Sequence, residues 1–268
     1  PRVTWINHCT FLVSVGNLSL LTDPIWSVRC SPLSFLGPKR RHEAPLTLEK
    51  LPRIDFVLLS HDHYDHFDTK TLLKLAELNP GITWIIPLGL KKRLHKLNFR
   101  HIIEMKWWEQ IPIGMRGQEV VITAVPAQHF SGRGIFDKNR TLWTGFVVDF
   151  VHREKRDKRL YFVGDTGYNQ KDFKKIGKEF GTMDLSLIPI GTYVPEAFMD
   201  AVHISPHKAV AIHDEVGSLL SVGMHWKTFR LSSEDLEQPP YDLYRALKQR
   251  GIEPETFRVL EPGQTINW

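Results

Sequence analysis

The stretch Ser60-His61-Asp62-His63-Tyr64-Asp65-His66 decides how this chain is interpreted. It follows residues 54–59, an apolar run with the length and composition of a buried strand. The stretch therefore lies where a strand ends and a loop begins, which is where α/β folds place their chemistry. Imidazole nitrogens and carboxylate oxygens suit zinc and similar transition metals. Four such side chains within this short stretch predict a metal site: His61, His63, Asp65 and His66.

The spacing within this cluster divides its side chains. Asp65 and His66 are adjacent and must point in different directions, whereas His61 and His63 are two residues apart and can point the same way. One arrangement that fits has His61 and His63 on one metal and Asp65 and His66 on a second. Each metal then needs ligands from elsewhere in the chain.

Three further polar residues come directly after apolar, strand-like runs. His129 follows the run that ends at Val125, Asp165 follows residues 160–164, and His225 ends the short run 221–224. Each alone also suits a structural role, because a buried Asp can cap a turn and a buried His can hydrogen-bond within the core. Together with the first cluster, the three favour a shared metal site.

These residues carry a family resemblance. Residues 61–66 match the HxHxDH motif of the metallo-β-lactamase superfamily, and His129, Asp165 and His225 match its remaining ligand positions. The chain further resembles the N-acyl-phosphatidylethanolamine-hydrolysing phospholipases D over nearly its whole length. That closer resemblance lies in Leu21-Thr22-Asp23-Pro24-Ile25, Gly37-Pro38-Lys39-Arg40, Gly164-Asp165-Thr166-Gly167-Tyr168 and His225-Trp226-Lys227-Thr228-Phe229. It implies a single α/β domain over residues 1–268, a four-layer αβ/βα sandwich of two mixed sheets flanked by helices.

The resemblance also implies a site with two zinc ions, although other divalent transition metals suit the same ligands. In it, His61, His63 and His129 bind one zinc, Asp65, His66 and His225 bind the other, and Asp165 bridges them. Two metals about 4 Å apart lower the pKa of a shared water, which supplies hydroxide at neutral pH. Asp65 and Asp165 are the implied catalytic carboxylates. Asp165 suits a bridge better than a general base, because a doubly coordinated carboxylate is weakly basic.

The implied activity is that of a phosphodiesterase of phospholipase D type. It would hydrolyse N-acyl-phosphatidylethanolamine or related glycerophospholipids to phosphatidate and an N-acylethanolamine. The chain departs from the family at Asn7-His8, where the family has Gly-His. It departs again at Ser34-Phe35, where the family has other lipid-contacting residues, so phospholipid contacts are expected to differ.

Substrate contacts are predicted in the segment from Ile25 to about Leu48, which has no clear periodicity. Loops this long inside a compact domain are usually functional or mobile. Its apolar side chains can enter a membrane interface with basic residues at headgroup depth, or they can pack beneath the loop. The predicted contacts are Trp26, Phe35, Lys39, Arg40 and, from a separate segment, His203.

Two further carboxylates flank the histidine cluster. Asp62 and Asp68 are candidates for orienting the ligand imidazoles from outside the metal site. Asp68 equally suits a helix cap, because residues 69–78 have a helical pattern.

Alternation of strand-like and helix-like segments predicts an α/β layered fold. A hairpin is expected where residues 10–15 and 17–21 meet at Gly16-Asn17. Further strands are expected at 82–86, 119–125, 142–150, 159–163, 184–190, 222–225 and 257–260, and helices at 69–78, 88–96, 172–180, 205–216 and 240–250. The basic run 153–159 is predicted to be an exposed hairpin turn. The two halves have a similar order of elements, which indicates related structures.

The bulk composition narrows the class of protein. The chain has 268 residues, 42% of them hydrophobic, which is enough for a full core. No apolar run reaches the roughly 18 residues of a membrane span. A net charge of +5 permits attraction to anionic membrane surfaces, nucleic acid or phosphate-bearing substrates. The basic runs lack the interleaved aromatics of a nucleic-acid platform, so no nucleic-acid partner is expected.

The cysteines and the first residue bear on location. Cys9 and Cys30 are too few for a disulfide framework and suit a reducing compartment, so we expect an intracellular protein, cytoplasmic or peripherally bound to a membrane. The chain begins at Pro1 rather than Met, which leaves room for a preceding segment and any targeting signal in it. A homodimer is compatible with these features.

Two other functions compete with a phosphodiesterase activity on phospholipids. The same metals would also serve the hydrolysis of a lactone, a cyclic nucleotide or a soluble phosphodiester, but the long apolar loop favours a lipid. A metal-binding or nucleic-acid-binding protein without catalysis is the other rival, and the complete ligand set argues against it.

Overall fold

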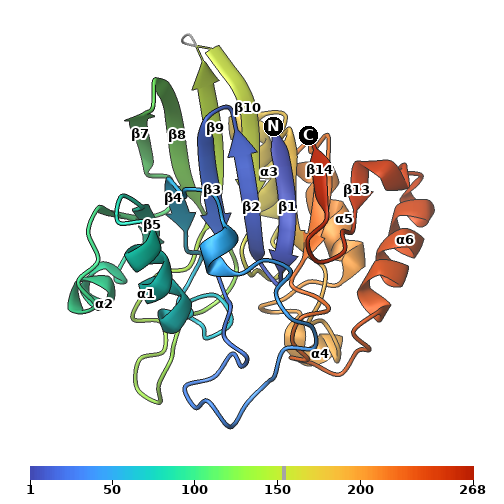
Figure 1. Ribbon diagram of the computed structural model, residues 1–268. Coiled ribbons are helices and arrows are strands. Elements are labelled where there is room, and N and C mark those ends of the chain that lie inside the picture. Colours follow the sequence, from blue (N-terminus) through green and yellow to red (C-terminus); the bar gives the residue numbers. More distant parts are fainter. Residues whose placement is uncertain (153–154) are drawn as a thin grey trace.

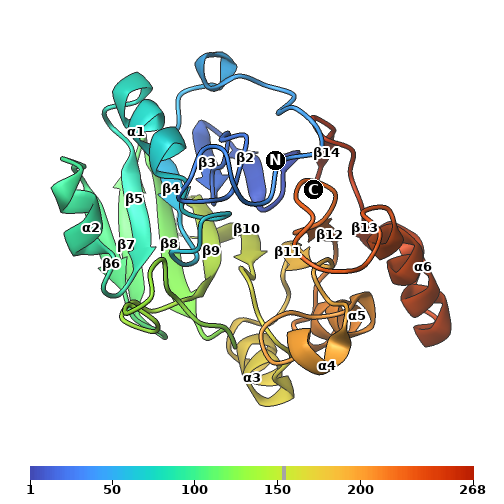
Figure 2. The same cartoon turned by 90° about the horizontal axis from the view of Figure 1, so that it is seen from below.

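Two seven-stranded mixed sheets face each other in the computed structural model, which describes residues 1–152 and 155–268. Helices cover the outer faces of both sheets (Figures 1 and 2). The predicted four-layer α/β sandwich is confirmed.

The first sheet comes from the N-terminal half plus the last strand of the chain. Its strands are Arg2–Asn7 (β1), Thr10–Val15 (β2), Leu18–Thr22 (β3), Phe56–Leu58 (β4), Thr83–Pro87 (β5), Ile102–Met105 (β6) and Thr265–Asn267 (β14). They lie in the order β14-β1-β2-β3-β4-β5-β6. The pairs from β14 to β3 are antiparallel, and those from β3 to β6 are parallel. Helices Thr69–Leu78 (α1) and Lys91–Lys96 (α2) lie beside this sheet, and a 3-10 turn spans Leu48–Lys50.

The second sheet repeats this arrangement. Its strands are Gln110–Met115 (β7), Gln118–Val125 (β8), Gly145–His152 (β9), Lys155–Phe162 (β10), Leu185–Pro189 (β11), Ser221–Met224 (β12) and Phe257–Arg258 (β13). Taken from β7 to β13, the first pairs are antiparallel and those from β10 onward are parallel. The two halves therefore share one topology, as their similar order of elements indicated.

Four helices accompany the second sheet (Figure 2). They are Gln170–Phe180 (α3), Glu196–Met199 (α4), Pro206–Glu215 (α5) and Gln238–Arg250 (α6), with a 3-10 turn at Pro254–Thr256. Ser205 occupies the N-cap position of α5 and Pro206 its first turn, as the sequence predicted. Among the helices of the described residues, none is long and apolar enough to cross a membrane.

The main core lies between the sheets. Its largest fully buried side chains include Trp5, Phe11, Phe56, Phe146 and Tyr161. A second, smaller core joins the first sheet to α1 and α2. Strand β4 is buried along its whole length, so the apolar run before His61 is held on both faces. This rigid support fixes the position at which the histidine cluster begins.

Some elements differ from the prediction. Strand β7 was not predicted; it contains Pro112 and Gly114 and is an edge strand, where a missing N–H is tolerated. In the basic run, residues 155–159 belong to β10 rather than to a turn, and residues 153–154 lie outside the described residues. Arg159 in this strand pairs with Asp149 of β9, with Nε 2.5 Å from Oδ1. Four short elements, β1, β6, β14 and α4, were not predicted.

Candidate metal centre

Seven side chains from four segments converge where strands end. The motif residues follow β4, while His129, Asp165 and His225 follow β8, β10 and β12 respectively. All of these segments meet at the lower end of the molecule in Figure 1. The structure therefore brings together all seven residues that the sequence singled out as metal ligands: His61, His63, Asp65, His66, His129, Asp165 and His225.

Three imidazoles form the first group. His61 Nε2 lies 2.9 Å from His63 Nδ1, and His129 Nε2 lies 3.2 Å from the same atom. Asp165 Oδ2 lies 3.9 Å from His61 Nε2 and 3.7 Å from His129 Nε2. His63 thus presents Nδ1 to the group, whereas His61 and His129 present Nε2.

Two carboxylates and two imidazoles form the second group. Asp65 Oδ2 lies 3.2 Å from His66 Nε2 and 3.4 Å from His225 Nε2. Asp165 Oδ2 lies 3.2 Å and 3.1 Å from the same two nitrogens. Ligands about 2.0 Å from a tetrahedral ion are about 3.3 Å apart, so these four atoms are spaced as a metal would require. Asp165 Oδ2 borders both groups and is the atom that joins them.

Asp23 supports both groups from behind. Its Oδ2 accepts hydrogen bonds from His66 Nδ1 at 2.6 Å and from Ser60 Oγ at 2.5 Å, and Ser60 Oγ in turn accepts one from His61 Nδ1 at 2.9 Å. Such outer bonds fix the orientation of a ligand imidazole and leave the other ring nitrogen free. Sequence reasoning missed Asp23, although Thr22-Asp23-Pro24 directly follows a strand. That position was the available signal.

Two further imidazoles, those of His129 and His225, are held in the same way. His129 Nδ1 donates to the carbonyl of Val202 at 2.8 Å, and His225 Nδ1 lies 3.1 Å from Thr192 Oγ1. Two ring nitrogens that face the second group are buried and have no hydrogen-bond partner, namely His66 Nε2 and His225 Nε2. Buried polar atoms are normally satisfied, so these orphaned nitrogens fit a metal.

The electrostatics differ between the groups. Burial lowers the pKa of His61 and His63, and it lowers that of His129 to about 3, so all three offer free lone pairs at neutral pH. In the second group, burial opposes charge on Asp165, but His225 and His66 bring its pKa well below the usual range. Burial also opposes charge on His225, yet Asp165 raises its pKa to about 9. A cation entering the second group therefore displaces protons from imidazoles.

Neither Asp62 nor Asp68 orients a ligand imidazole, so the prediction of that role is wrong for both carboxylates. Asp62 Oδ1 accepts the backbone N–H of Gly132 at 2.8 Å. Asp68 makes no side-chain cap bond to α1 either. Its carboxylate instead accepts from the backbone N–H groups of Trp26 and Ser27 and from two hydroxyls, and so anchors the start of the long loop.

The predicted substrate contacts fall into three classes. Phe35 and Lys39 are exposed on the loop, and Phe35 is 75% exposed. Trp26 is half-buried and donates to the carbonyl of Leu46, which fits the alternative that it packs beneath the loop. Arg40 faces inward and donates to the carbonyls of residues 25 and 27, which makes its guanidinium part of the loop framework.

His203 comes from a separate segment of the sequence and lies beside the two groups. Its Nδ1 is 3.8 Å from Asp165 Oδ2 and has no hydrogen-bond partner. Its ring centroid lies 5.2 Å from those of His129 and His225. The side chain is 11% exposed, so it borders the site without being sealed off.

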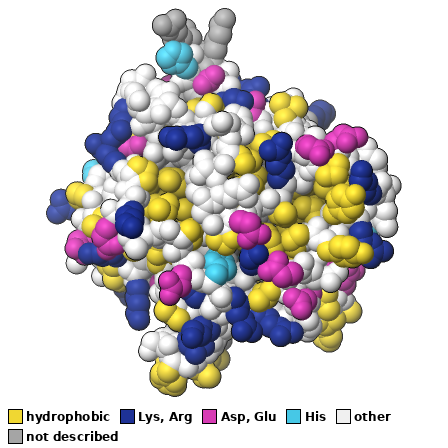
Figure 3. All heavy atoms as spheres, turned by 45° about the vertical axis from the view of Figure 1, so that its right-hand side comes forward, with side chains coloured by type: hydrophobic (Ala, Val, Ile, Leu, Met, Phe, Trp, Pro, Cys, Tyr) yellow, Lys and Arg dark blue, Asp and Glu magenta, His cyan; other side chains and the backbone are white. Residues whose placement is uncertain are grey.

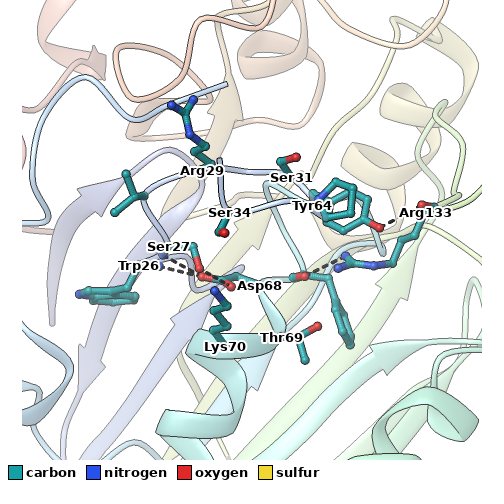
Figure 4. A pocket seen from close by; sticks show the side chains of 13 residues that line it. Trp26, Ser27, Arg29, Ser31, Ser34, Tyr64, Asp68, Thr69, Lys70 and Arg133 are labelled. Atoms are coloured by element: carbon teal, nitrogen blue, oxygen red, sulfur yellow. Dashed lines mark hydrogen bonds between the residues drawn. The ribbon is translucent and has the colours of Figure 1, made fainter. Parts of the chain in front are cut away.

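A cavity of about 580 Å³ opens beside the motif (Figure 4). Tyr64 and Phe67 line it, but none of the seven converging residues does. Its other lining residues combine apolar, hydroxyl, basic and acidic groups: Trp26, Ser27, Val28, Arg29, Ser31, Pro32, Ser34, Asp68, Thr69, Lys70 and Arg133. The guanidinium carbon of Arg133 lies 3.8 Å from the centre of the Tyr64 ring. This mixed lining suits part of a large amphiphilic molecule.

Comparison with known proteins places these features in a family. A model of the β-lactamase superfamily domain matches residues 19–226, which include all seven converging residues. The chain belongs to the metallo-β-lactamase superfamily. A metallo hydrolase from Ignicoccus hospitalis shares this superfamily fold, with a TM-score of 0.68 and 22% identity over 99% of this chain and 97% of that one.

Two curated relatives are more similar in sequence. The chain is 40% identical over 268 residues to N-acyl-phosphatidylethanolamine-hydrolyzing phospholipase D 1 of Caenorhabditis elegans, covering 97% of this chain and 74% of that protein. It is 33% identical over 256 residues to the mitochondrial protein of the same name from Saccharomyces cerevisiae, covering 95% and 53%. The chain is a metal-dependent hydrolase of this superfamily, with histidine and aspartate groups that can bind metal.

Proposed function

We propose that this hydrolase is a zinc-dependent phosphodiesterase of phospholipase D type that acts on N-acyl-phosphatidylethanolamine or related glycerophospholipids. The main support is the pair of ligand groups joined by Asp165 Oδ2, in a chain with 40% identity to a phospholipase of that name. His61, His63 and His129 would hold one zinc, and Asp65, His66 and His225 the other. When bound, two such ions lower the pKa of water and neutralise charge on phosphoryl oxygens.

The chain's own residues prepare this site before substrate arrives. Asp23 locks His66 directly and His61 through Ser60, so one carboxylate orients a ring of each group. Burial keeps the first group's imidazoles neutral and therefore able to coordinate. His203 borders Asp165 with a free ring nitrogen, which suits a hydrogen bond to a substrate oxygen. Such preorganisation reduces the reorganisation needed during reaction.

A lipid substrate is favoured by what surrounds the site. The cavity beside Tyr64 has space for part of an amphiphile. Three exposed apolar tips come from segments adjoining the site, namely Phe35 and Leu36 in the long loop, Ile135 and Phe136 after His129, and Phe198 in α4 before His203. Figure 3 shows an apolar tip projecting at the lower end with basic side chains directly above it. We infer that these tips enter a membrane interface.

Product analysis tests the proposal. The zinc-loaded protein is incubated with mixed vesicles that contain N-acyl-phosphatidylethanolamine, and the lipids are separated by mass spectrometry. Release of phosphatidate together with an intact N-acylethanolamine is expected. Release of free fatty acid would show that a different bond is cut. If neither phosphatidate nor N-acylethanolamine forms while a soluble phosphodiester or lactone is turned over, the lipid substrate is refuted. Asp165→Asn serves as the inactive control.

A further inference from the structure

His8 lies in the turn between β1 and β2, far in sequence from the motif it contacts. It is 1% exposed, and its backbone adopts a left-handed conformation with φ 43°. Its Nε2 lies 2.9 Å from Asp65 Oδ2. That distance is a hydrogen bond in which the ring N–H donates to the carboxylate.

The backbone of His8 reaches the same group. Its carbonyl accepts the backbone N–H of His225 at 3.1 Å and the indole N–H of Trp5 at 3.0 Å. Its own N–H donates to Thr228 Oγ1 at 2.8 Å. The ring centroid lies 4.2 Å from that of His225. One residue thus contacts Asp65 through its side chain and His225 through its main chain.

We propose that His8 is the positioning residue that fixes Asp65 and thereby completes the second metal position, an inference that rests on the two-zinc site proposed above. Asp65 has a 15% exposed side chain, and its Oδ2 must keep its spacing to His66 and His225 to bind a cation. His8 makes no hydrogen bond to the first group, so its loss should leave that group intact. Partners that orient a ligand typically contribute 10–100-fold in metal affinity.

The turn alone does not require histidine. A backbone at positive φ is adopted more readily by Asn or Gly. What histidine adds is a donor at Nε2, far enough from the backbone to reach Asp65. The amide nitrogen of Gln occupies nearly the same place as Nε2, whereas that of Asn lies near Nδ1 and falls short. His8→Asn and His8→Gln therefore separate the turn from the donor.

The experiment titrates metal-free protein with zinc and, in parallel, with cobalt(II). Wild type is expected to bind two equivalents per chain by mass spectrometry. His8→Asn should bind the first equivalent normally and the second about 10–100-fold more weakly, with a matching loss in the cobalt absorption spectrum. His8→Gln should retain the second equivalent within about threefold of wild type. Thermal unfolding of the metal-free variants checks that the fold is kept.

The outcomes separate the two proposals. If His8→Asn binds both equivalents as wild type does, or if His8→Gln weakens the second equivalent as much as His8→Asn does, the positioning role is wrong while the two-zinc site stands. If wild type itself binds a single equivalent, the two-zinc site is wrong and the role of His8 falls with it. Loss of both equivalents in His8→Asn would also refute the assignment, because His8 is placed at one position only.

Discussion

Replacing Asp68 with Ala should free the start of the long loop without emptying the metal centre. The carboxylate is buried and accepts from Ser27 N at 2.9 Å, Trp26 N at 3.2 Å, Ser27 Oγ at 2.8 Å and Thr71 Oγ1 at 2.5 Å. The two hydroxyls can turn to other acceptors. The backbone N–H of Trp26 keeps a second acceptor, Thr71 Oγ1 at 2.8 Å, but that of Ser27 loses its partner, and one unsatisfied group costs about 1–3 kcal/mol. The loop's closed state should therefore lose about 1–3 kcal/mol.

Because the loss is local, hydrogen exchange is the direct assay. A change of about 1–3 kcal/mol corresponds to exchange of the Ser27 amide that is faster by roughly 5-fold to 150-fold, limited by the rate of local opening. Asp68→Asn should show a smaller change, because its amide oxygen can still accept from both backbone groups. Asp172→Ala is the matched control, since it removes a carboxylate from the first turn of α3, on the other helix layer.

Activity distinguishes the anchor from a role at the metals. Asp68→Ala should raise KM for lipid vesicles, because Trp26 and Ser27 line the cavity beside Tyr64, while turnover of a small soluble phosphodiester and zinc content stay near wild type. Loss of zinc with equal loss of both activities would refute this reasoning and show that Asp68 acts at the metals. Unchanged exchange in residues 25–48 would refute it as well.

Other predictions address the site, the surface and pH. Asp165→Asn should bind at most one zinc tightly and lose more than about 100-fold in kcat, measured by metal analysis and steady-state kinetics, because Asp165 Oδ2 borders both groups. Lys39→Ser with Arg41→Ser should weaken binding to anionic vesicles by about 1 kcal/mol per charge in sedimentation assays while sparing a soluble substrate; unchanged sedimentation would contradict the membrane interpretation. His213 lies outside the site, and burial lowers its pKa to about 4. Below about pH 6.5 the unfolded chain therefore binds a proton that the folded chain does not, and the stability of the fold falls as the pH drops from there towards 4. His213→Asn should remove about 2 kcal/mol of the loss in unfolding free energy between pH 7.5 and pH 5, measured by urea denaturation at both values, and an unchanged pH dependence would refute the assignment.

The sequence predicts the fold wherever a segment carries its own pattern. The hairpin at Gly16, the apolar run before His61 and the Ser205-Pro206 helix start all form as expected. It does not predict β7, because a strand with Pro112 and Gly114 is recognisable only once the sheet order shows that it lies at an edge. It leaves the position of Trp26 open, because composition does not reveal that an aromatic side chain in a loop has a carbonyl to donate to.

The residues of the metal centre likewise differ in how readily the sequence reveals them. The seven converging residues are recognisable because each follows a strand, and strand ends meet at one edge of a sandwich. The residues that hold them are harder to recognise, since Asp23 and His8 contact the motif across 43 and 57 positions of sequence, although Asp23 also follows a strand. Neither has a spacing to the motif that a local pattern could register. Only the pairing of β3 beside β4, and the turn that follows β1, bring them there.

The two groups are unequal in charge, and this inequality bears on where an anionic substrate binds. Three neutral imidazoles and a shared carboxylate would leave a divalent cation in the first group with most of its charge uncompensated. A cation in the second group has Asp65 to itself as well as its share of Asp165. A phosphodiester should therefore approach the first group, since attraction grows with uncompensated charge in a site with little water. His203 borders Asp165, and its ring centroid lies 5.2 Å from those of both His129 and His225, so its free nitrogen would meet a phosphoryl oxygen at either group.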